Sequence, residues 1–104
     1  MTVKTEFGTY ESVYLEVRRY AYDGSVAILL KNRSDGPIAY LTVCLEDSSL
    51  ADYEAYVDTN NCPWALKLIE EYKLGNPTGK TRLSGYCTYP AVQFDSKRLA
   101  ELGQ

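Results

Sequence analysis

Histidine is missing from the sequence altogether. Its absence excludes Ser-His-Asp and Cys-His nucleophilic sites, most catalytic zinc sites and the commonest general base. Cysteine is scarce: Cys44, Cys62 and Cys87 are an odd number with no Cys-x-x-Cys pair, which favours reduced thiols over a disulfide framework or a zinc site. We therefore expect no catalytic residue, no metal and no cofactor.

Long apolar runs are missing too. Residues 1–6 lack the apolar stretch of a secretory signal, and no segment approaches the roughly 18 apolar residues that a membrane span needs. The expectation is a cytoplasmic protein without membrane contact. The chain of 104 residues is expected to fold as a single domain over residues 1–104.

Net charge is small, at only −3. Such a balance does not provide the basic surface that grips a phosphate backbone, so direct nucleic-acid binding is not expected. The charge is nevertheless unevenly spread along the chain. Segment 46–58 has no Lys or Arg and carries five carboxylates, namely Glu46, Asp47, Asp52, Glu54 and Asp58.

The first clear pattern that is present belongs to strands. Apolar and polar residues alternate over 13–22, Asp23-Gly24 suits a tight hairpin turn, and 25–31 is apolar on both faces, as in a central strand. Residues 38–45 alternate again. These three strands predict an antiparallel β-meander. Further strands over 54–57 and 86–94, with Pro90 at an edge or a bulge, bring the total to four or five.

One strong helix is predicted over 64–74. Apolar side chains recur there at helical spacing, at Ala65, Leu68, Ile69 and Tyr72. Gly75 is expected to end the helix in a left-handed conformation, and 76–85 is expected to be a loop. Asp95 or Ser96 can cap a short C-terminal helix. The predicted fold class is α+β, with a meander of four to five strands packed on one main helix.

A run of small polar residues, Asp58 to Pro63, introduces this helix. Asn and Asp favour turns and helix N-caps, and Pro suits the first helical turn. The position of Cys62 just ahead of the helix suggests that the helix dipole lowers its pKa and makes it nucleophilic. The alternative is that Cys62 is a small, half-buried structural residue.

Two polar segments can meet at one end of the sheet. One holds Asp58, Asn60 and Asn61, and the other holds Ser84, Thr88 and Tyr89. Together they form either a hydrogen-bond network that locks two loops, or a site for a small ligand or an enzyme reaction. In the second case Asp58 is the base and Tyr86 or Tyr89 is the acid. Both interpretations stay open at this point.

Tyrosine is in excess, with ten residues. Four of them are expected to project from the meander face opposite its apolar side: Tyr14, Tyr20, Tyr22 and Tyr40. Tyr is enriched in interfaces, so this face is a candidate surface for a protein partner. The candidate surface also includes four acidic residues, Glu46, Asp47, Asp52 and Glu54. The alternative is that another segment of the chain covers this face.

Several stretches carry a family resemblance. They are Tyr22 to Leu30, Ile38 to Val43, Val57-Asp58-Thr59-Asn60-Asn61-Cys62-Pro63, Pro77-Thr78-Gly79 and Ser84-Gly85-Tyr86-Cys87-Thr88-Tyr89-Pro90. Over about residues 12–95, the chain resembles a small bacterial domain-of-unknown-function family with the motifs "DTNN.P", "PTG" and "SGFCTYP". Tyr86 stands where that family more often has Phe. The resemblance implies a setting, the conjugative elements and related mobile DNA of gut Firmicutes, and no assigned activity.

The function expected from these features is protein binding without chemistry. In the setting that the resemblance implies, the chain is an accessory protein of a mobile genetic element. It binds and inhibits a host defence component such as a CRISPR or restriction nuclease, whose basic nucleic-acid groove the clustered carboxylates can occupy. The alternative is the enzyme or small-ligand site described above. A homodimer is also left open.

Overall fold

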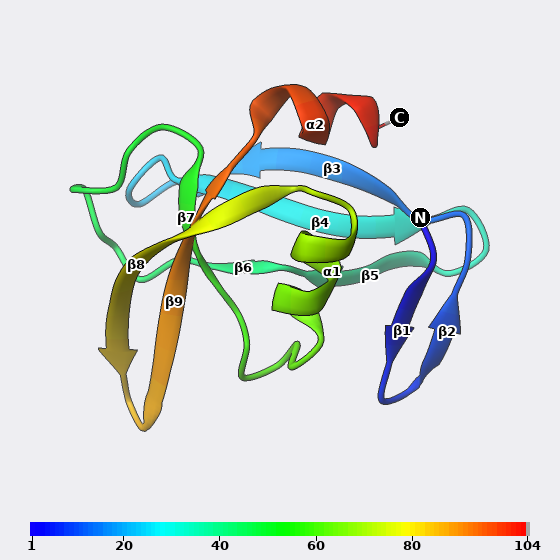
Figure 1. Cartoon of the computed structure of the whole chain (residues 1–104), viewed down its shortest axis with the longest axis horizontal. Helices are drawn as coiled ribbons and strands as arrows, with labels where there is room; N and C mark the ends of the chain where they lie inside the picture. Colours follow the sequence, from blue (N-terminus) through cyan, green and yellow to red (C-terminus); the bar gives the residue numbers. More distant parts are fainter. Residues whose placement is uncertain (104) are drawn as a thin grey trace.

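The computed structural model describes residues 1–103, which form three antiparallel sheets and two short helices (Figure 1). The first sheet pairs β1 (Val3–Thr5) with β2 (Gly8–Tyr10). The second has the order β3 (Tyr14–Arg19), β4 (Val26–Asn32), β5 (Gly36–Tyr40). The third has the order β6 (Thr42–Val43), β7 (Glu54–Val57), β9 (Cys87–Phe94), β8 (Gly75–Ser84). The helices are α1 (Ala65–Glu71) and α2 (Ser96–Glu101).

The predicted fold class, a β-meander packed on one main helix, is wrong. Strands take up 48% of the described residues and helices only 13%, so no helix forms a main layer. The strand predicted over 38–45 is two strands in different sheets, because β5 pairs with β4 whereas β6 pairs with β7. The chain changes sheets at the buried Leu41. Its N–H donates to the carbonyl of Ile28 (2.9 Å), and its carbonyl accepts from the N–H of Asp58 (2.8 Å).

The segment predicted to be a loop, 76–85, instead forms most of β8. Its Gly, Pro and Thr residues favour turns locally, but β9 provides pairing partners for residues 75–77 and 81–84. The pairing is irregular between Pro77 and Thr81, which accommodates the missing N–H of Pro77 and the positive φ of Gly79 (89°). Pairing between distant segments therefore overrides the local turn preference.

Helix α1 is shorter than predicted and ends differently. The N–H of Leu74 donates to the carbonyl of Ile69 (2.9 Å), which closes the last turn in a Schellman arrangement. The left-handed residue there is Lys73 (φ 56°), not Gly75 as predicted. Gly75 is required for another reason: a Cβ at this position would lie 2.5 Å from the carbonyl oxygen of Gln93 in β9.

Helix α2 confirms the predicted C-terminal helix. The Oδ1 atom of its N-cap, Asp95, accepts hydrogen bonds from the N–H groups of Lys97 (3.0 Å) and Arg98 (3.1 Å). On its buried side, Leu99 packs into the core. No helix within residues 1–103 is long and apolar enough to cross a membrane.

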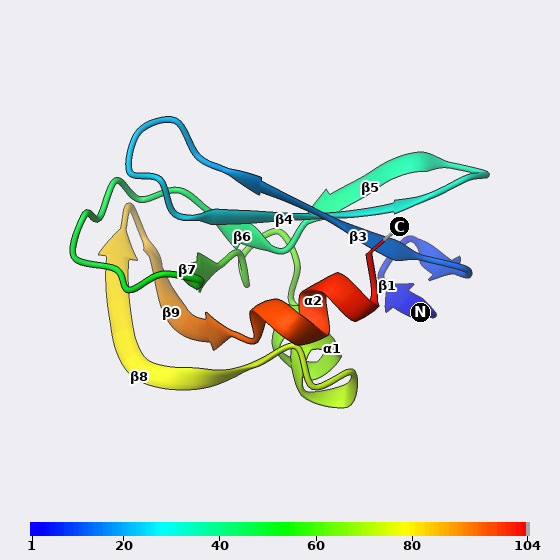
Figure 2. The ribbon, with the colours of Figure 1, turned by 90° about the horizontal axis from the view of Figure 1, so that it is seen from above.

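The core lies between the β3–β4–β5 sheet and an opposing layer made of the third sheet and both helices (Figure 2). The first layer contributes Leu15, Val26, Ile28 and Leu30, and the second contributes Ala55, Val57, Ala65, Leu68, Ile69, Leu74, Val92, Phe94 and Leu99. Ala27 and Leu29 are also buried but alternate to the other face of β4, beside Arg18 and Glu16. Long charged side chains thus cover that outer face.

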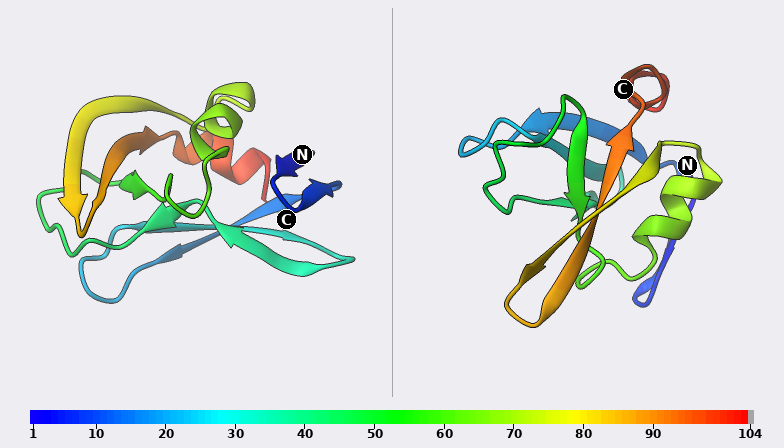
Figure 3. Two further views of the ribbon diagram at one scale, coloured as in Figure 1. Left: turned by 90° about the horizontal axis from the view of Figure 1, so that it is seen from below. Right: turned by 60° about the vertical axis from the view of Figure 1, so that its left-hand side comes forward.

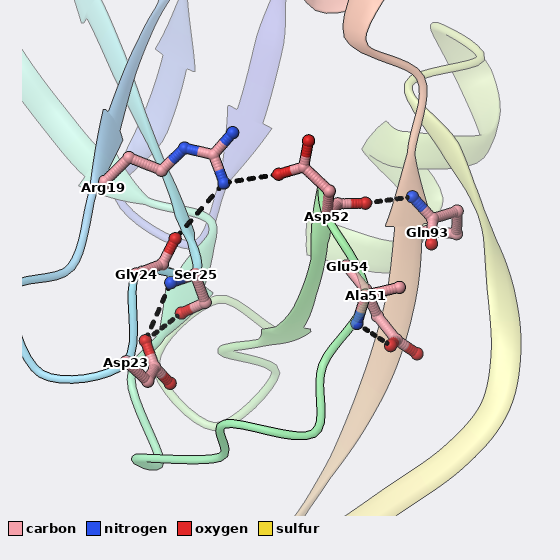
Figure 4. Close-up of polar contacts among 8 residues, drawn as sticks. All are labelled: Arg19, Asp23, Gly24, Ser25, Ala51, Asp52, Glu54 and Gln93. Atoms are coloured by element: carbon pink, nitrogen blue, oxygen red, sulfur yellow. Dashed lines mark hydrogen bonds and ion pairs between the residues drawn. The ribbon is translucent and has the colours of Figure 1, made fainter.

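The two layers are tied at one end by Arg19, the last residue of β3 (Figure 4). Its Nη1 atom lies 2.8 Å from Oδ1 of Asp52 and donates to the carbonyl of Gly24 (3.2 Å). Its guanidinium lies over the ring of Tyr53, 4.7 Å from the centroid. Nε2 of Gln93 in β9 donates to the carbonyl of Asp52 (2.8 Å). The segment before β7 is therefore held to both sheets.

Candidate functional site

An aromatic groove is lined by residues of the β1–β2 hairpin, of strand β5 and of the turn that precedes α1. Figures 1 and 3 show where these three segments lie in the fold. Its volume is about 350 Å³. The residues that line it include three aromatic residues, Phe7, Tyr10 and Trp64, two acidic residues, Glu6 and Asp58, and also Tyr40, whose side chain lies on the outer face of the β3–β4–β5 sheet. These residues come from three separate parts of the chain, so only the tertiary structure assembles the groove.

The β1–β2 hairpin forms one wall of the groove and holds Phe7 outward. The hydroxyl of Thr5 shapes the turn, since it accepts from the N–H of Phe7 (3.1 Å) and donates to the carbonyl of Gly8 (3.2 Å). Phe7 is 85% exposed. Val3, fully buried, anchors the hairpin in the core. An aromatic ring is thus presented to solvent from an anchored turn.

Further hydrogen bonds fix the start of the chain against the rest of the protein. The Met1 ammonium donates to the carbonyl of Val13 (2.7 Å), and the N–H of Val13 donates back to the carbonyl of Met1 (2.8 Å). The hydroxyl of Tyr72, just after α1, accepts from the N–H of Thr2 (2.9 Å) and donates to its carbonyl (3.2 Å). The hairpin wall therefore has a fixed position relative to α1.

The opposite wall is the turn before α1. Asp58 organises it: Oδ1 accepts from the N–H of Asn61 (3.2 Å), and Oδ2 accepts from Nδ2 of the same residue (2.9 Å). Asp58 therefore caps a turn, whereas the N-cap of α1 is Trp64, which makes no side-chain cap hydrogen bond. The thiol of Cys62 donates to the carbonyl of Tyr40 (3.5 Å) and joins this wall to β5.

The hypothesis that Cys62 is an activated nucleophile is wrong. The residue is only 4% exposed. Burial raises the pKa of its thiol to about 11, with further contributions from the carboxylates of Asp58 and Glu6. Its role is structural, as the alternative interpretation held.

The charged residues that line the groove are all acidic. They are Glu6 and Asp58, and no Lys or Arg of residues 1–103 lines the groove. Within residues 1–103, neither carboxylate forms an ion pair with a basic side chain. The groove therefore combines aromatic surface with negative charge that the protein itself does not neutralise.

The four tyrosines predicted for the partner surface are only partly brought together. Tyr14 and Tyr40 lie on the outer face of the β3–β4–β5 sheet. The hydroxyl of Tyr20 is instead used internally, since it donates to the carbonyl of Thr42 (3.0 Å). Tyr22 lies in the β3–β4 turn and is 83% exposed. Tyr40 is the one of the four that lines the groove.

A charge network occupies the outer face between the tyrosines. Glu16 pairs with Arg18 and with Lys31 (3.4 Å), and Arg18 Nη1 donates to the hydroxyl of Tyr40 (3.4 Å). These contacts pair Glu16 with two cations and hold Tyr40 in place. The outer face is therefore a mixed surface rather than a purely aromatic one.

Most of the predicted acidic residues serve the fold. Asp52 pairs with Arg19, as described, and Glu54 is buried, with Oε1 accepting from the N–H of Ala51 (2.9 Å) and lying 3.6 Å from Nζ of Lys80. Reversing the charge of Glu54 would therefore destabilise the fold, so it cannot test an acidic surface. Glu46 is exposed, as Asp52 is, and has a positive φ of 53°.

Asp47 is also committed to internal contacts. Its Oδ1 accepts from the hydroxyl (2.6 Å) and the N–H (2.9 Å) of Ser49, and its Oδ2 accepts from the hydroxyl of Tyr56 (2.7 Å). These hydrogen bonds lower the pKa of the Asp47 carboxyl to about 2. Burial, reinforced by Asp47, raises the pKa of Tyr56 to about 12.

The predicted polar cluster stays divided. Ser84 and Thr88 are exposed near the end of the β8–β9 hairpin, and Asn60 is exposed in the turn before α1. Tyr89 is partly buried, and burial raises its pKa, followed by contributions from Cys87 and the carboxylate of Asp58. Within residues 1–103, no hydrogen bond joins the two segments.

A second hollow, of about 840 Å³, lies beside the β4–β5 turn but is polar. The side-chain amide of Asn32 forms hydrogen bonds within the protein, since its Nδ2 donates to the carbonyl of Glu11 (3.2 Å) and to Oδ2 of Asp35 (3.0 Å). The N–H of Asp35 donates back to Oδ1 of Asn32 (2.7 Å). These contacts order the turn, so we place the candidate site in the aromatic groove.

The sequence analysis did not identify four of the lining residues as site residues: Phe7, Glu6, Tyr10 and Trp64. For Phe7 and Glu6 the sequence does hold a signal, because Thr5-Glu6-Phe7-Gly8 places an aromatic residue beside a glycine in a turn-like segment between two short alternating runs. No comparable signal identifies Trp64, because its apolar character fits the start of a core-facing helix equally well.

A family model described as "Domain of unknown function (DUF4313)" matches residues 14–104. No curated protein and no solved structure matches the chain. The matched region includes β5 and the turn before α1, whereas Phe7 and the rest of the β1–β2 hairpin precede it. The groove thus joins a part of the chain that the family model covers to a part that it does not.

Proposed function

We infer that this chain, which belongs to the DUF4313 family of domains of unknown function, binds another protein through the aromatic groove. The family name assigns no activity, so the inference of binding rests on the geometry of the groove. The observation that carries this proposal is Phe7, an aromatic ring that stands 85% exposed on an anchored turn beside the groove. Aromatic residues at the centre of an interface supply much of its binding energy.

Rigidity of the walls supports the same proposal. The hairpin is tied to α1 through Tyr72, and the turn before α1 is locked by Asp58 and tied to β5 through Cys62. A preformed site loses little conformational entropy when a partner binds. Phe7 is 85% exposed and is not among the core residues of the part of the chain that the structure describes, so its presence is better explained by binding than by folding.

For the biological setting, we propose an accessory protein of a mobile genetic element. The support is the resemblance of its polar motifs to the small bacterial family described above. The proposed target is a host defence component, such as a CRISPR or restriction nuclease. The enzyme alternative gains no support from the hydrogen bonds described, since Asp58 is engaged with Asn61 and Ser84 lies on another hairpin.

The experiment is affinity capture from a bacterial host, quantified by mass spectrometry, with two variants matched in exposure. Phe7→Ala removes the ring at the groove, and Tyr22→Ala removes a ring that is 83% exposed on the β3–β4 turn. We expect one partner to be retained by Tyr22→Ala and depleted about tenfold by Phe7→Ala. Capture that Phe7→Ala leaves unchanged would overturn binding at the groove.

Two further measurements define the partner. Light scattering identifies a second copy of the chain as the partner if the mass doubles and Phe7→Ala returns it to one chain. A plasmid-interference assay addresses the defence target: the wild type and Tyr22→Ala are expected to protect the plasmid, whereas Phe7→Ala is not. Absence of protection by the wild type would contradict inhibition of that defence system.

A further inference from the structure

We propose that the groove selects a cationic side chain, Lys or Arg, from a basic segment of its protein partner; this inference rests on the proposed function. The two carboxylates, Glu6 and Asp58, line the groove from different walls, the β1–β2 hairpin and the turn before α1. A cation in the groove would therefore meet negative charge on both sides.

The charge of these carboxylates is available for a ligand. Four acids elsewhere, Glu16, Asp52, Glu54 and Glu101, pair with a Lys or Arg of the same chain, but no such pair within residues 1–103 involves Glu6 or Asp58. The two hydrogen bonds that Asp58 accepts come from the neutral Asn61 and leave its net charge in place. A partner cation would thus supply the missing counter-charge.

The aromatic lining favours a cation over another apolar group. The faces of Phe, Tyr and Trp rings carry negative potential, which attracts ammonium and guanidinium groups. The same chemistry already operates inside this protein, where the guanidinium of Arg19 lies 4.7 Å from the ring centroid of Tyr53 and pairs with Asp52. Phe7 and Glu6 offer the same combination of ring and carboxylate on adjacent residues of the hairpin.

Anionic occupants fit poorly. No Lys or Arg of the described residues, 1–103, lines the groove, so a phosphate group would face two carboxylates without a compensating cation. A nucleic acid is therefore disfavoured as the occupant.

The test uses Trp64, the only tryptophan of the chain, as a fluorescence reporter inside the groove. The probe is a capped peptide in which arginines alternate with glycines, and its control is the same peptide with neutral citrulline in place of arginine. We expect saturable binding of the arginine peptide that weakens as ionic strength rises. The citrulline peptide is expected to bind about tenfold more weakly, a loss that lies between those of an exposed and a desolvated cation–π contact.

Matched variants assign the effect to named side chains. Phe7→Ala is expected to weaken binding of the arginine peptide about tenfold, and Glu6→Gln about threefold. Two controls, Tyr22→Ala and Glu46→Gln, alter exposed groups outside the groove and are expected to leave the affinity unchanged. Melting curves confirm that all four variants stay folded.

The outcomes separate the two proposals. Equal binding of the arginine and citrulline peptides, or no binding of either, overturns cation selection. Tighter binding of a short single-stranded oligonucleotide than of the arginine peptide overturns it too, in favour of nucleic acid. If capture of the cellular partner nevertheless still depends on Phe7, protein binding at the groove stands and only the class of ligand was wrong.

Discussion

Replacing Gly75 with alanine tests whether close packing of β8 against β9 controls stability. Gly75 pairs with Phe94, and a Cβ at Gly75 would lie 2.5 Å from the carbonyl oxygen of Gln93, 2.8 Å from Cα of Phe94 and 2.9 Å from Cγ1 of Val92. All three distances are shorter than a relaxed carbon contact. Two of them involve backbone atoms of the paired strand, which no change of side-chain rotamer can relieve.

The magnitude follows from two opposing terms. Forcing an extra carbon into a packed region costs about 1–3 kcal/mol, and contact with backbone atoms favours the upper end of that range. Alanine also restricts the unfolded chain, which returns about 0.4–1 kcal/mol. We therefore expect Gly75→Ala to lower the free energy of unfolding by about 2 kcal/mol. For a domain of this length, that shifts the melting temperature by about 8–16 °C.

Urea unfolding monitored by circular dichroism measures this difference, with Gly103→Ala as the matched control. A Cβ at Gly103 would meet its nearest atom, the carbonyl oxygen of Leu15, at 3.4 Å, so this variant should stay within about 0.5 kcal/mol of the wild type. The midpoint should fall for Gly75→Ala without a change in slope. If Gly75→Ala is as stable as Gly103→Ala, the close approach of the two strands is refuted.

Three further outcomes are expected. Lys73→Gly should raise the free energy of unfolding by about 0.5–1 kcal/mol in the same urea experiment, because φ at this residue is 56°; Lys73→Ala keeps the strain and should give no gain. The pKa of Asp47 is about 2 in the folded protein against an ordinary 3.8, so its carboxylate stabilises the protein fully above about pH 4, and this contribution disappears as the pH falls to about 2. In acid unfolding curves, the difference in stability between the wild type and Asp47→Asn should therefore shrink between about pH 4 and about pH 2. A constant difference would contradict the hydrogen bonds assigned to Asp47. Iodoacetamide at neutral pH should modify Cys62 much more slowly than the half-exposed Cys87, as measured by peptide mass spectrometry, because burial holds the thiol pKa of Cys62 at about 11; equal rates would contradict its burial.

Local patterns in the sequence were sufficient for several elements. The alternation over 13–22 and the apolar run over 25–31 correspond to β3 and β4, and the short strand at 54–57 is β7. The cap of α2 by Asp95 involves residues only two and three positions away, so it too is visible locally. In each case the determining contacts are short-range or depend only on which face is apolar.

The predictions that were wrong concern features that depend on contacts between residues far apart in the chain. Nothing in 38–45 marks Leu41 as the point where the strand leaves one sheet for another, since its partners, Ile28 and Asp58, lie far away in the chain. The turn-like composition of β8 was outweighed by its pairing with β9. The need for glycine at position 75 likewise comes from the approach of β9, not from the end of the helix.

The sequence alone determined that this chain has no histidine-based chemistry, where most of its strands lie, and that a short C-terminal helix begins at Asp95 or Ser96, because these depend on composition and on neighbours a few residues apart. Only the tertiary structure decided the division into sheets and the candidate site. The groove exists because hairpin 5–10, strand β5 and the turn before α1 pack side by side. That packing leaves Phe7 exposed and two carboxylates without a basic partner among residues 1–103, a combination that no local pattern specifies.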